Sequence, residues 1–120
     1  MSRALVDTSI LVQRWRERKS VPMSVENRSK AISTVTYIEL LQGANRRQKA
    51  ETLVFLKEFE HVRLDREISD RAIELIDYHS ETDGLRLADA LIAATCLTQN
   101  LPLLTLNRRH FERIDGLELI

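Results

Sequence analysis

The chain has 120 residues, 43% of them hydrophobic and 30% charged, and its 18 basic and 18 acidic residues leave no formal net charge. This length and apolar content exclude a disordered chain and suit one core, so we expect a single domain over residues 1–120. No apolar run approaches the roughly 20 residues that span a bilayer, and no leader pattern is visible, so we expect a cytoplasmic protein without membrane contact.

Short apolar runs alternate with amphipathic segments along the chain. We expect strands at 4–6, 31–35, 62–64 and 103–106, and an edge strand at 117–120. The first strand should be followed by a helix to about residue 18 and a loop over 19–30. Further helices are expected over 37–44, 47–59, 66–82 and 87–99. Strands that alternate with helices indicate the α/β class, with a parallel sheet covered on both faces.

Two helices carry clear boundary signals. Thr36 and Glu39 have the spacing of a capping box, which predicts that a helix begins at Thr36. Residues 87–99 are rich in alanine, the best helix former, and Asn100 follows them. This helix contains Cys96, the only cysteine, which excludes an internal disulfide and a cysteine-rich zinc site.

Three carboxylates stand where strands end and helices begin, the place where parallel sheets collect functional residues. Asp7 ends the first strand, Glu39 is expected near the start of the helix after the second, and Asp89 lies in the first turn of the alanine-rich helix. If the three converge, their repulsion requires a cation, and hard oxygen ligands favour Mg²⁺ or Mn²⁺ over zinc. Each also has a plainer interpretation as a helix-capping or first-turn acid, and spacing alone does not show convergence.

Basic residues are unevenly distributed. Residues 13–30 carry a local charge of +4 and residues 51–89 one of −6, and 14 of the 18 basic residues are arginine. Arginine suits phosphate because its planar fork binds two oxygens at once. The clusters are Arg14, Arg16, Arg18 and Lys19; Arg46 and Arg47; and Arg108 and Arg109. Solvated helix faces are the alternative interpretation of each cluster.

Four blocks of sequence together resemble one known family. The blocks are Leu5–Val12, Ile32–Gly43, Leu87–Thr95, and Leu103–Asn107 with Phe111. In this order they resemble the PIN-domain ribonucleases, in particular the VapC-like toxins of toxin–antitoxin pairs. The resemblance covers nearly the whole chain and implies a three-layer α/β/α domain around a short central parallel sheet.

The resemblance also implies a site. Its acidic positions fall on Asp7, Glu39 and Asp89, which would hold Mg²⁺ or Mn²⁺, with Glu39 binding directly or through water. The supporting positions are Thr8, Ser9, Thr105 and Asn107. One departure concerns the last block: many relatives carry a further acid where this chain has His110, and Asn107 is uncharged. This departure bears on whether a second metal ion binds and on the level of activity.

The function implied is a metal-dependent endoribonuclease, the toxin of a type II toxin–antitoxin pair, with an RNA substrate, an antitoxin partner and a homodimeric state. We expect four arginines to bind RNA phosphates: Arg14, Arg16, Arg108 and Arg109. Trp15 either stacks on a base or packs in the core. Tyr37 and the apolar residues of 51–59 serve the dimer, the antitoxin or the core.

Other functions remain in competition. A catalytically weak module that binds RNA or antitoxin is suggested by Asn107 and His110. A phosphoacceptor receiver domain needs a lysine after the last core strand, and residues 103–111 contain none. A dinucleotide-binding fold needs a glycine-rich loop, which three scattered glycines cannot form.

Overall fold

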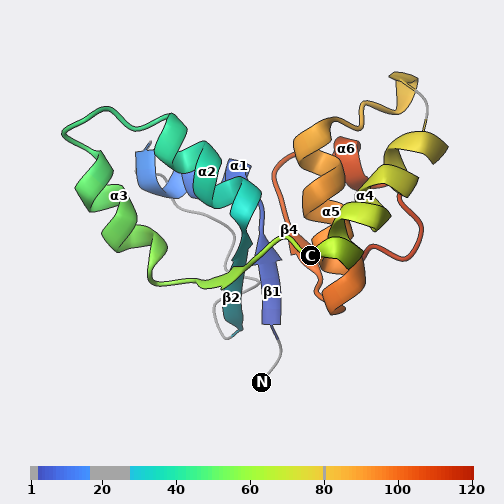
Figure 1. Cartoon of the computed structure of the whole chain (residues 1–120), viewed down its shortest axis with the longest axis horizontal. Coiled ribbons are helices and arrows are strands. Elements are labelled where there is room, and N and C mark those ends of the chain that lie inside the picture. Colours follow the sequence, from blue (N-terminus) through green and yellow to red (C-terminus); the bar gives the residue numbers. More distant parts are fainter. Residues whose placement is uncertain (1–2, 17–27, 80) are drawn as a thin grey trace.

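The architecture is a parallel sheet with helices on both sides, seen in a computed structural model that describes residues 3–16, 28–79 and 81–120 (Figure 1). The strands are β1 (Arg3–Val6), β2 (Ser29–Ser33), β3 (Glu60–Val62) and β4 (Leu103–Leu104). Their order in the sheet is β3-β2-β1-β4, and every neighbouring pair is parallel. The first strand of the chain therefore lies inside the sheet, between the second strand and the last.

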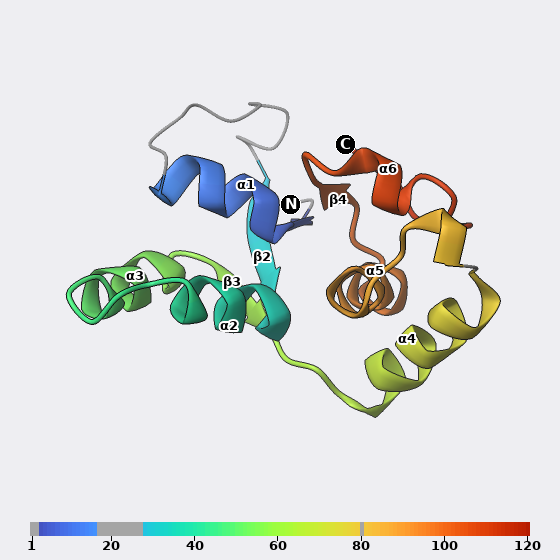
Figure 2. The same cartoon turned by 90° about the horizontal axis from the view of Figure 1, so that it is seen from above.

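Helices form one layer on each face of the sheet. The helical elements are α1 (Thr8–Leu11), η1 (Val12–Arg16), α2 (Thr34–Gln42), α3 (Lys49–Leu56), α4 (Arg66–Tyr78), η3 (Glu81–Asp83), α5 (Leu87–Gln99) and α6 (Arg108–Phe111). Seen from above, α1, α2 and α3 lie on one side of the sheet and α4, α5 and α6 on the other (Figure 2). The predicted three-layer α/β/α fold is confirmed. None of the helices in the described part of the chain combines the length and the apolar character that a bilayer crossing needs.

The side chains of β1 point alternately to the two faces of the sheet, and each face has its own hydrophobic core. Leu5 joins the buried cluster formed with α4 and α5, whereas Ala4 and Val6 join the cluster formed with α1, α2 and α3. On β4, Leu103 and Leu104 divide between the two clusters in the same way. Side chains that alternate between two apolar faces explain why these strands are uninterrupted hydrophobic runs.

The helix after β2 begins earlier than predicted. Ser33 is its N-cap, in extended conformation, and its hydroxyl accepts a hydrogen bond from the Val35 N–H at 3.1 Å. Thr36 lies inside the helix and is fully buried, so the predicted capping box was wrong. The strand pairing with β3 ends at Ser33, and the first residue able to cap at that point starts the helix.

Several other boundaries also differ from the predictions. The helix after β1 changes from one α-turn to a π-helical segment at Val12. The second and third strands, predicted at 31–35 and 62–64, each begin two residues earlier. The predicted edge strand over 117–120 is reduced to one bridge, between Leu103 and Leu119.

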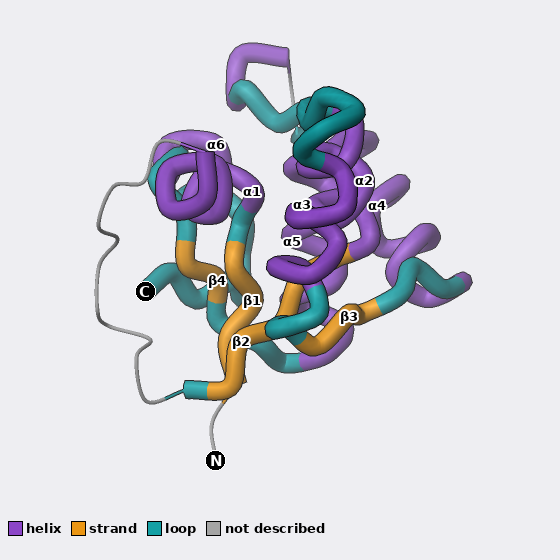
Figure 3. Tube along the Cα trace, turned by 90° about the vertical axis from the view of Figure 1, so that its left-hand side faces the viewer, coloured by secondary structure: helices purple, strands orange, loops and turns teal. Residues whose placement is uncertain are grey.

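The parallel topology fixes where a site can form. Strands β1, β2 and β4 run into α1, α2 and α6 at the same end of the sheet (Figure 3). The residues at these junctions therefore come together although they are far apart in the sequence.

Candidate functional site

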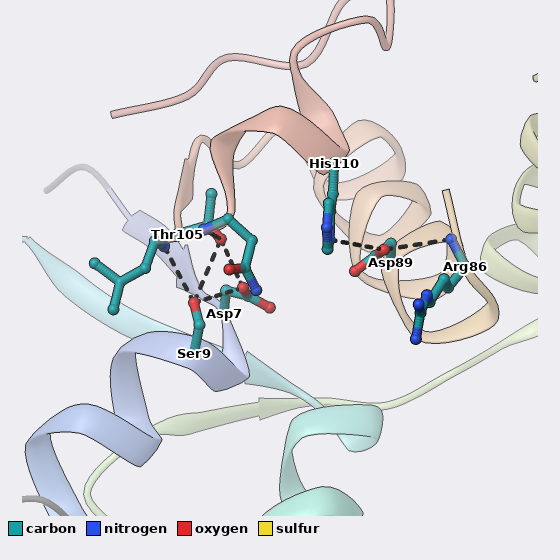
Figure 4. A network of polar contacts seen from close by, with 8 residues as sticks. Asp7, Ser9, Arg86, Asp89, Thr105 and His110 are labelled. Carbon is teal, nitrogen blue, oxygen red and sulfur yellow. Dashed lines mark hydrogen bonds and ion pairs between the residues drawn. The ribbon is translucent and has the colours of Figure 1, made fainter. Parts of the chain in front are cut away.

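Asp7, which directly follows β1, is a buried carboxylate held by hydroxyl groups. It is 4% exposed, and its Oδ2 accepts hydrogen bonds from Thr105 Oγ1 at 2.6 Å and from Ser9 Oγ at 2.8 Å (Figure 4). Although Asp7 stands at the N-cap position of α1, its side chain makes no capping hydrogen bond. The helix-capping interpretation of Asp7 is therefore wrong, and its carboxylate is fixed by the turn after β4 instead.

The two hydroxyls are themselves oriented by backbone groups. Thr105 Oγ1 accepts from the Asn107 N–H at 3.0 Å, and Ser9 Oγ accepts from the Leu106 N–H at 3.1 Å. A carboxylate only accepts, so each hydroxyl accepts from its backbone N–H and directs its own hydrogen to Asp7. This turn also explains why β4 stops at Leu104, two residues short of the predicted strand end.

Glu39 reaches the same region from α2. Its Oε1 accepts a hydrogen bond from the Thr8 hydroxyl at 2.7 Å, and that hydroxyl lies 2.9 Å from the Thr36 hydroxyl. Glu39 lies in the second turn of α2 and not at its start, so the interpretation as the return partner of a capping Thr36 was wrong. The glutamate instead links α2 to the residue that follows Asp7.

Asp89 sits in the first turn of α5, as predicted. Its Oδ2 accepts from the Arg86 N–H at 3.3 Å and lies 3.3 Å from His110 Nδ1. Burial is the main cause that raises the pKa of Asp89, and the nearby Asp7 charge acts in the same direction. The Arg86 N–H and the charges of His110 and Arg86 oppose this rise. Asp89 is thus both a helix-terminal acceptor and a partly buried carboxylate.

The three carboxylates open on one cleft of about 380 Å³. The remaining residues that line it are Thr8, Ser9, Val12, Ala88, Ile92 and Asn107. Two larger hollows, of about 560 and 530 Å³, lie along α4 and contain none of the predicted site residues. The smaller cleft is the candidate site, because of these three hollows it alone is lined by carboxylates from three different segments of the fold.

The oxygens of these carboxylates fit a hard cation by donor type. The described contacts fall on Asp7 Oδ2, Glu39 Oε1 and Asp89 Oδ2, and within the described residues the second oxygen of each has no hydrogen-bond or ion-pair partner. However, no three acidic, histidine or cysteine side chains among the described residues are arranged as ligands of one ion. The arrangement suits Mg²⁺, which keeps several waters and needs one or two carboxylates directly.

The predicted RNA-binding arginines fall partly outside the described structure. Arg14, on η1, and Arg109, on α6, are exposed. Arg108 is also exposed, and its Nη1 donates to the Ile120 carbonyl at 3.4 Å. Only the backbone of Arg16 is described, and the rest of that cluster, Arg18 and Lys19, lies outside the described residues. Since α6 follows the turn that holds Asp7, Arg108 and Arg109 belong to the cleft end of the sheet.

Both aromatic candidates pack against other rings of the chain. Trp15 stacks on Phe55 with ring centroids 4.5 Å apart, and its Nε1 donates to Thr52 at 3.3 Å. Its interpretation as a core residue is therefore confirmed. Tyr37 is partly buried and stacks on His61 at 4.9 Å. In the segment 51–59, Phe55 and Leu56 are core residues, while Val54 is exposed.

Sequence reasoning missed two residues of this site. Thr36 was assigned only a capping role, yet it lies three residues before Glu39, so both side chains share one helix face. Arg86 was not singled out, although it precedes Asp89 by the spacing at which a first-turn acid reaches back to the cap.

Comparison with known proteins gives consistent matches over the length of the chain. A family model described as PIN domain matches residues 4–117. Ribonuclease VapC1 of Methanocaldococcus jannaschii is 34% identical over 116 residues, which are 94% of this chain and 82% of that protein. A toxin–antitoxin complex from Klebsiella pneumoniae includes a chain 32% identical, with a TM-score of 0.76 and coverage of 95% of this chain and 94% of that one. VapBC2 of Rickettsia felis, bound to a promoter DNA fragment, gives 25% identity, a TM-score of 0.81 and coverage of 98% and 97%.

Proposed function

The chain belongs to the PIN-domain family, and from that premise we propose that it is a metal-dependent endoribonuclease, the toxin of a type II toxin–antitoxin pair. The observation that carries the proposal is the meeting of Asp7, Glu39 and Asp89 in one cleft. Each carboxylate is anchored through one oxygen, and within the described residues its other oxygen has no partner. Relatives named ribonuclease support the reaction type.

The proposed ligands of Mg²⁺ or Mn²⁺ are Asp7 and Asp89, with Glu39 binding directly or through water. A bound divalent cation of this kind lowers the pKa of a water molecule and stabilises the charge that develops on a phosphodiester. Ser9 and Thr105 fix the Asp7 carboxylate, and Thr8 fixes Glu39, so that the oxygens keep their positions when RNA enters. Asp7 is buried and only 14% of the Asp89 side chain is exposed, so the electrostatic interactions of both groups are stronger than at an open surface.

We propose that the chain binds an antitoxin, because the solved relatives include toxin–antitoxin complexes. A homodimer is part of the same proposal. Apolar side chains on the outer faces of α2 and α3, which include Ile38 at 56% and Val54 at 67% exposure, supply candidate contact surface for either partner.

One specific observation favours a second candidate function, a catalytically weak module that binds RNA or antitoxin. His110 lies against Asp89, with its Nδ1 at 3.3 Å from the carboxylate Oδ2. The two functions differ in one measurable property, which is whether the protein hydrolyses RNA when a divalent cation is present.

The test is an RNA cleavage assay with purified protein and a mixture of short single-stranded RNAs, in Mg²⁺, in Mn²⁺ and in EDTA. We expect cleavage with either cation and none in EDTA. Substitution of Asp7→Asn, Glu39→Gln or Asp89→Asn should lower the rate by about a hundredfold or more, because each removes charge that the reaction requires. The matched control is Asp115→Asn, which removes an exposed carboxylate outside the cleft and should leave the rate unchanged.

A thermal melting series separates metal binding from chemistry. A cation that binds only the folded state stabilises it by about 2.7 kcal/mol at a concentration of 100 Kd. We expect Mn²⁺ to raise the melting temperature of wild type and Asp115→Asn but not of Asp89→Asn. A cation response without RNA cleavage would favour the binding module, and the absence of both would remove the carboxylate cleft as a metal site.

A further inference from the structure

Arg86 stands beside Asp89, one of the carboxylates that line the cleft. It is the N-cap residue of α5, with an extended backbone, and its N–H donates to Asp89 Oδ2 at 3.3 Å. The residue is exposed, and its side chain extends along one side of Asp89 while His110 approaches from the other (Figure 4). The backbone of Arg86 thus anchors the carboxylate, and its guanidinium remains available to a ligand.

The guanidinium of Arg86 forms no ion pair within the described residues. Other arginines of the chain are paired with acids: Arg3 with Glu60 at 2.6 Å, and Arg113 with Asp83 at 2.9 Å. A long cationic side chain beside Asp89, without an acidic partner among the described residues, suits an anionic ligand.

The negative charges in the cleft favour a positively charged residue beside it. Asp7, Glu39 and Asp89 contribute three negative charges when ionised, and a phosphodiester brings one more. One divalent cation leaves this assembly negative, so a strand of RNA needs further positive charge next to the carboxylates. The planar guanidinium can bind two phosphate oxygens at once, which a lysine ammonium cannot do.

We propose that Arg86 is a substrate-binding residue that holds a phosphate group of the RNA strand beside Asp89. This inference rests on the proposed function, since it assumes that RNA occupies the cleft. Arg86 is a stronger candidate for this contact than Arg108, whose guanidinium donates to the Ile120 carbonyl. The backbone N–H of Arg86 already contacts a site carboxylate at 3.3 Å, whereas the described contact of Arg108 is with Ile120.

The test is fluorescence anisotropy with a labelled short single-stranded RNA, in EDTA and again in Mg²⁺ on the Glu39→Gln background, which slows cleavage, with a gel to verify that the RNA stays intact. Arg86→Ala keeps the backbone N–H that holds Asp89, so its melting temperature should match that of wild type. We expect its Kd for RNA to rise about tenfold or more, and the slope of log K against log salt to become shallower by about 0.7. Arg86→Lys should keep the salt slope but recover only part of the affinity, because the charge remains and the fork is lost.

The matched control is Arg71→Ala. Arg71 is an exposed arginine of α4 that pairs with Glu74 and does not line the cleft, so its loss removes the same charge elsewhere. If Arg86→Ala binds RNA as wild type does, or if both alanine variants weaken binding equally, the proposal is overturned. Wild type that binds RNA but never cleaves it, with Arg86→Ala still weakened, would overturn the proposed catalysis and leave Arg86 as the phosphate contact. Wild type that does not bind RNA at all would overturn both.

Discussion

The hydrogen bond from Thr105 to Asp7 should be a main support of the cleft, and Thr105→Val measures it. Valine has nearly the shape of threonine, so the change removes the hydroxyl without opening a cavity. A hydrogen bond to a charged acceptor contributes about 1.5–3 kcal/mol. Ser9 still donates to the same Asp7 oxygen after the change, so we take the lower part of that range, about 1.5–2 kcal/mol. Thr105→Val also removes the acceptor of the Asn107 N–H, but Asn107 is exposed, so its N–H can bind water instead at little cost in free energy.

For a domain of this size, about 1.5–2 kcal/mol corresponds to a fall of roughly 5–8 °C in melting temperature. The assay is thermal or urea unfolding at neutral pH without added metal. The matched control is Thr95→Val, another buried threonine, whose hydroxyl donates to the Leu91 carbonyl at 2.8 Å inside α5. That carbonyl is a neutral acceptor, so the control should lose less than about 1 kcal/mol.

A double-mutant cycle with Asp7→Asn tests whether the interaction depends on the charge. In the Asp7→Asn background the cost of Thr105→Val should fall to about 0.5–1 kcal/mol, because the acceptor is then neutral. The reasoning is refuted if Thr105→Val is as mild as Thr95→Val, or if its cost is the same with and without the Asp7 charge.

Three further predictions concern stability and reactivity. Asp89 has a raised pKa, so the folded state binds its proton more tightly and loses stability as pH rises above the ordinary carboxyl range. Asp89→Asn should therefore melt at a higher temperature than wild type at neutral pH, and this gain should vanish in acid. The exposed control Asp115→Asn should show no such pH-dependent gain. Phe111→Ala should cost about 3–5 kcal/mol in urea unfolding, since Phe111 is fully buried, whereas Val54→Ala at an exposed site should change little. Burial raises the pKa of the Cys96 thiol, so it should react with a thiol reagent only at the rate of unfolding; fast reaction of the native protein would contradict its buried position.

The sequence predicted a site residue best where the pattern of its own segment is enough to place it. Asp7 between two apolar runs, and Asp89 in an alanine-rich helix that spans 87–99 as expected, both depend on features of one segment. Glu39 was placed correctly at the cleft but for the wrong reason, because two residues, Ser33 and Thr36, could each cap the helix. Strand pairing selected Ser33, and pairing is not readable from a single segment.

The features that the sequence did not predict depend on contacts between distant parts of the chain. The strand predicted over 117–120 needs an edge position beside β4, and β4 itself has only two residues because Thr105 turns toward Asp7. The role proposed for Arg86 was likewise invisible in the sequence, since nothing there shows which arginine lies next to a cleft carboxylate. Convergence of the three acids follows from strand order and from the crossover that brings α5 to the cleft, both properties of the whole fold.

The strand order also sets when the cleft can exist during protein synthesis. The Asp7 carboxylate is made 98 residues before its Thr105 donor, and β4 must pair with the central strand to bring that donor to it. A growing chain that has produced α1, α2 and α3 still lacks this donor and the Asp89 side of the cleft. Contacts over such sequence separations form late in folding. A ribosome therefore holds an incomplete cleft until residue 105 is available, which on the proposed function delays RNA cleavage until β4 has been made and has paired with β1.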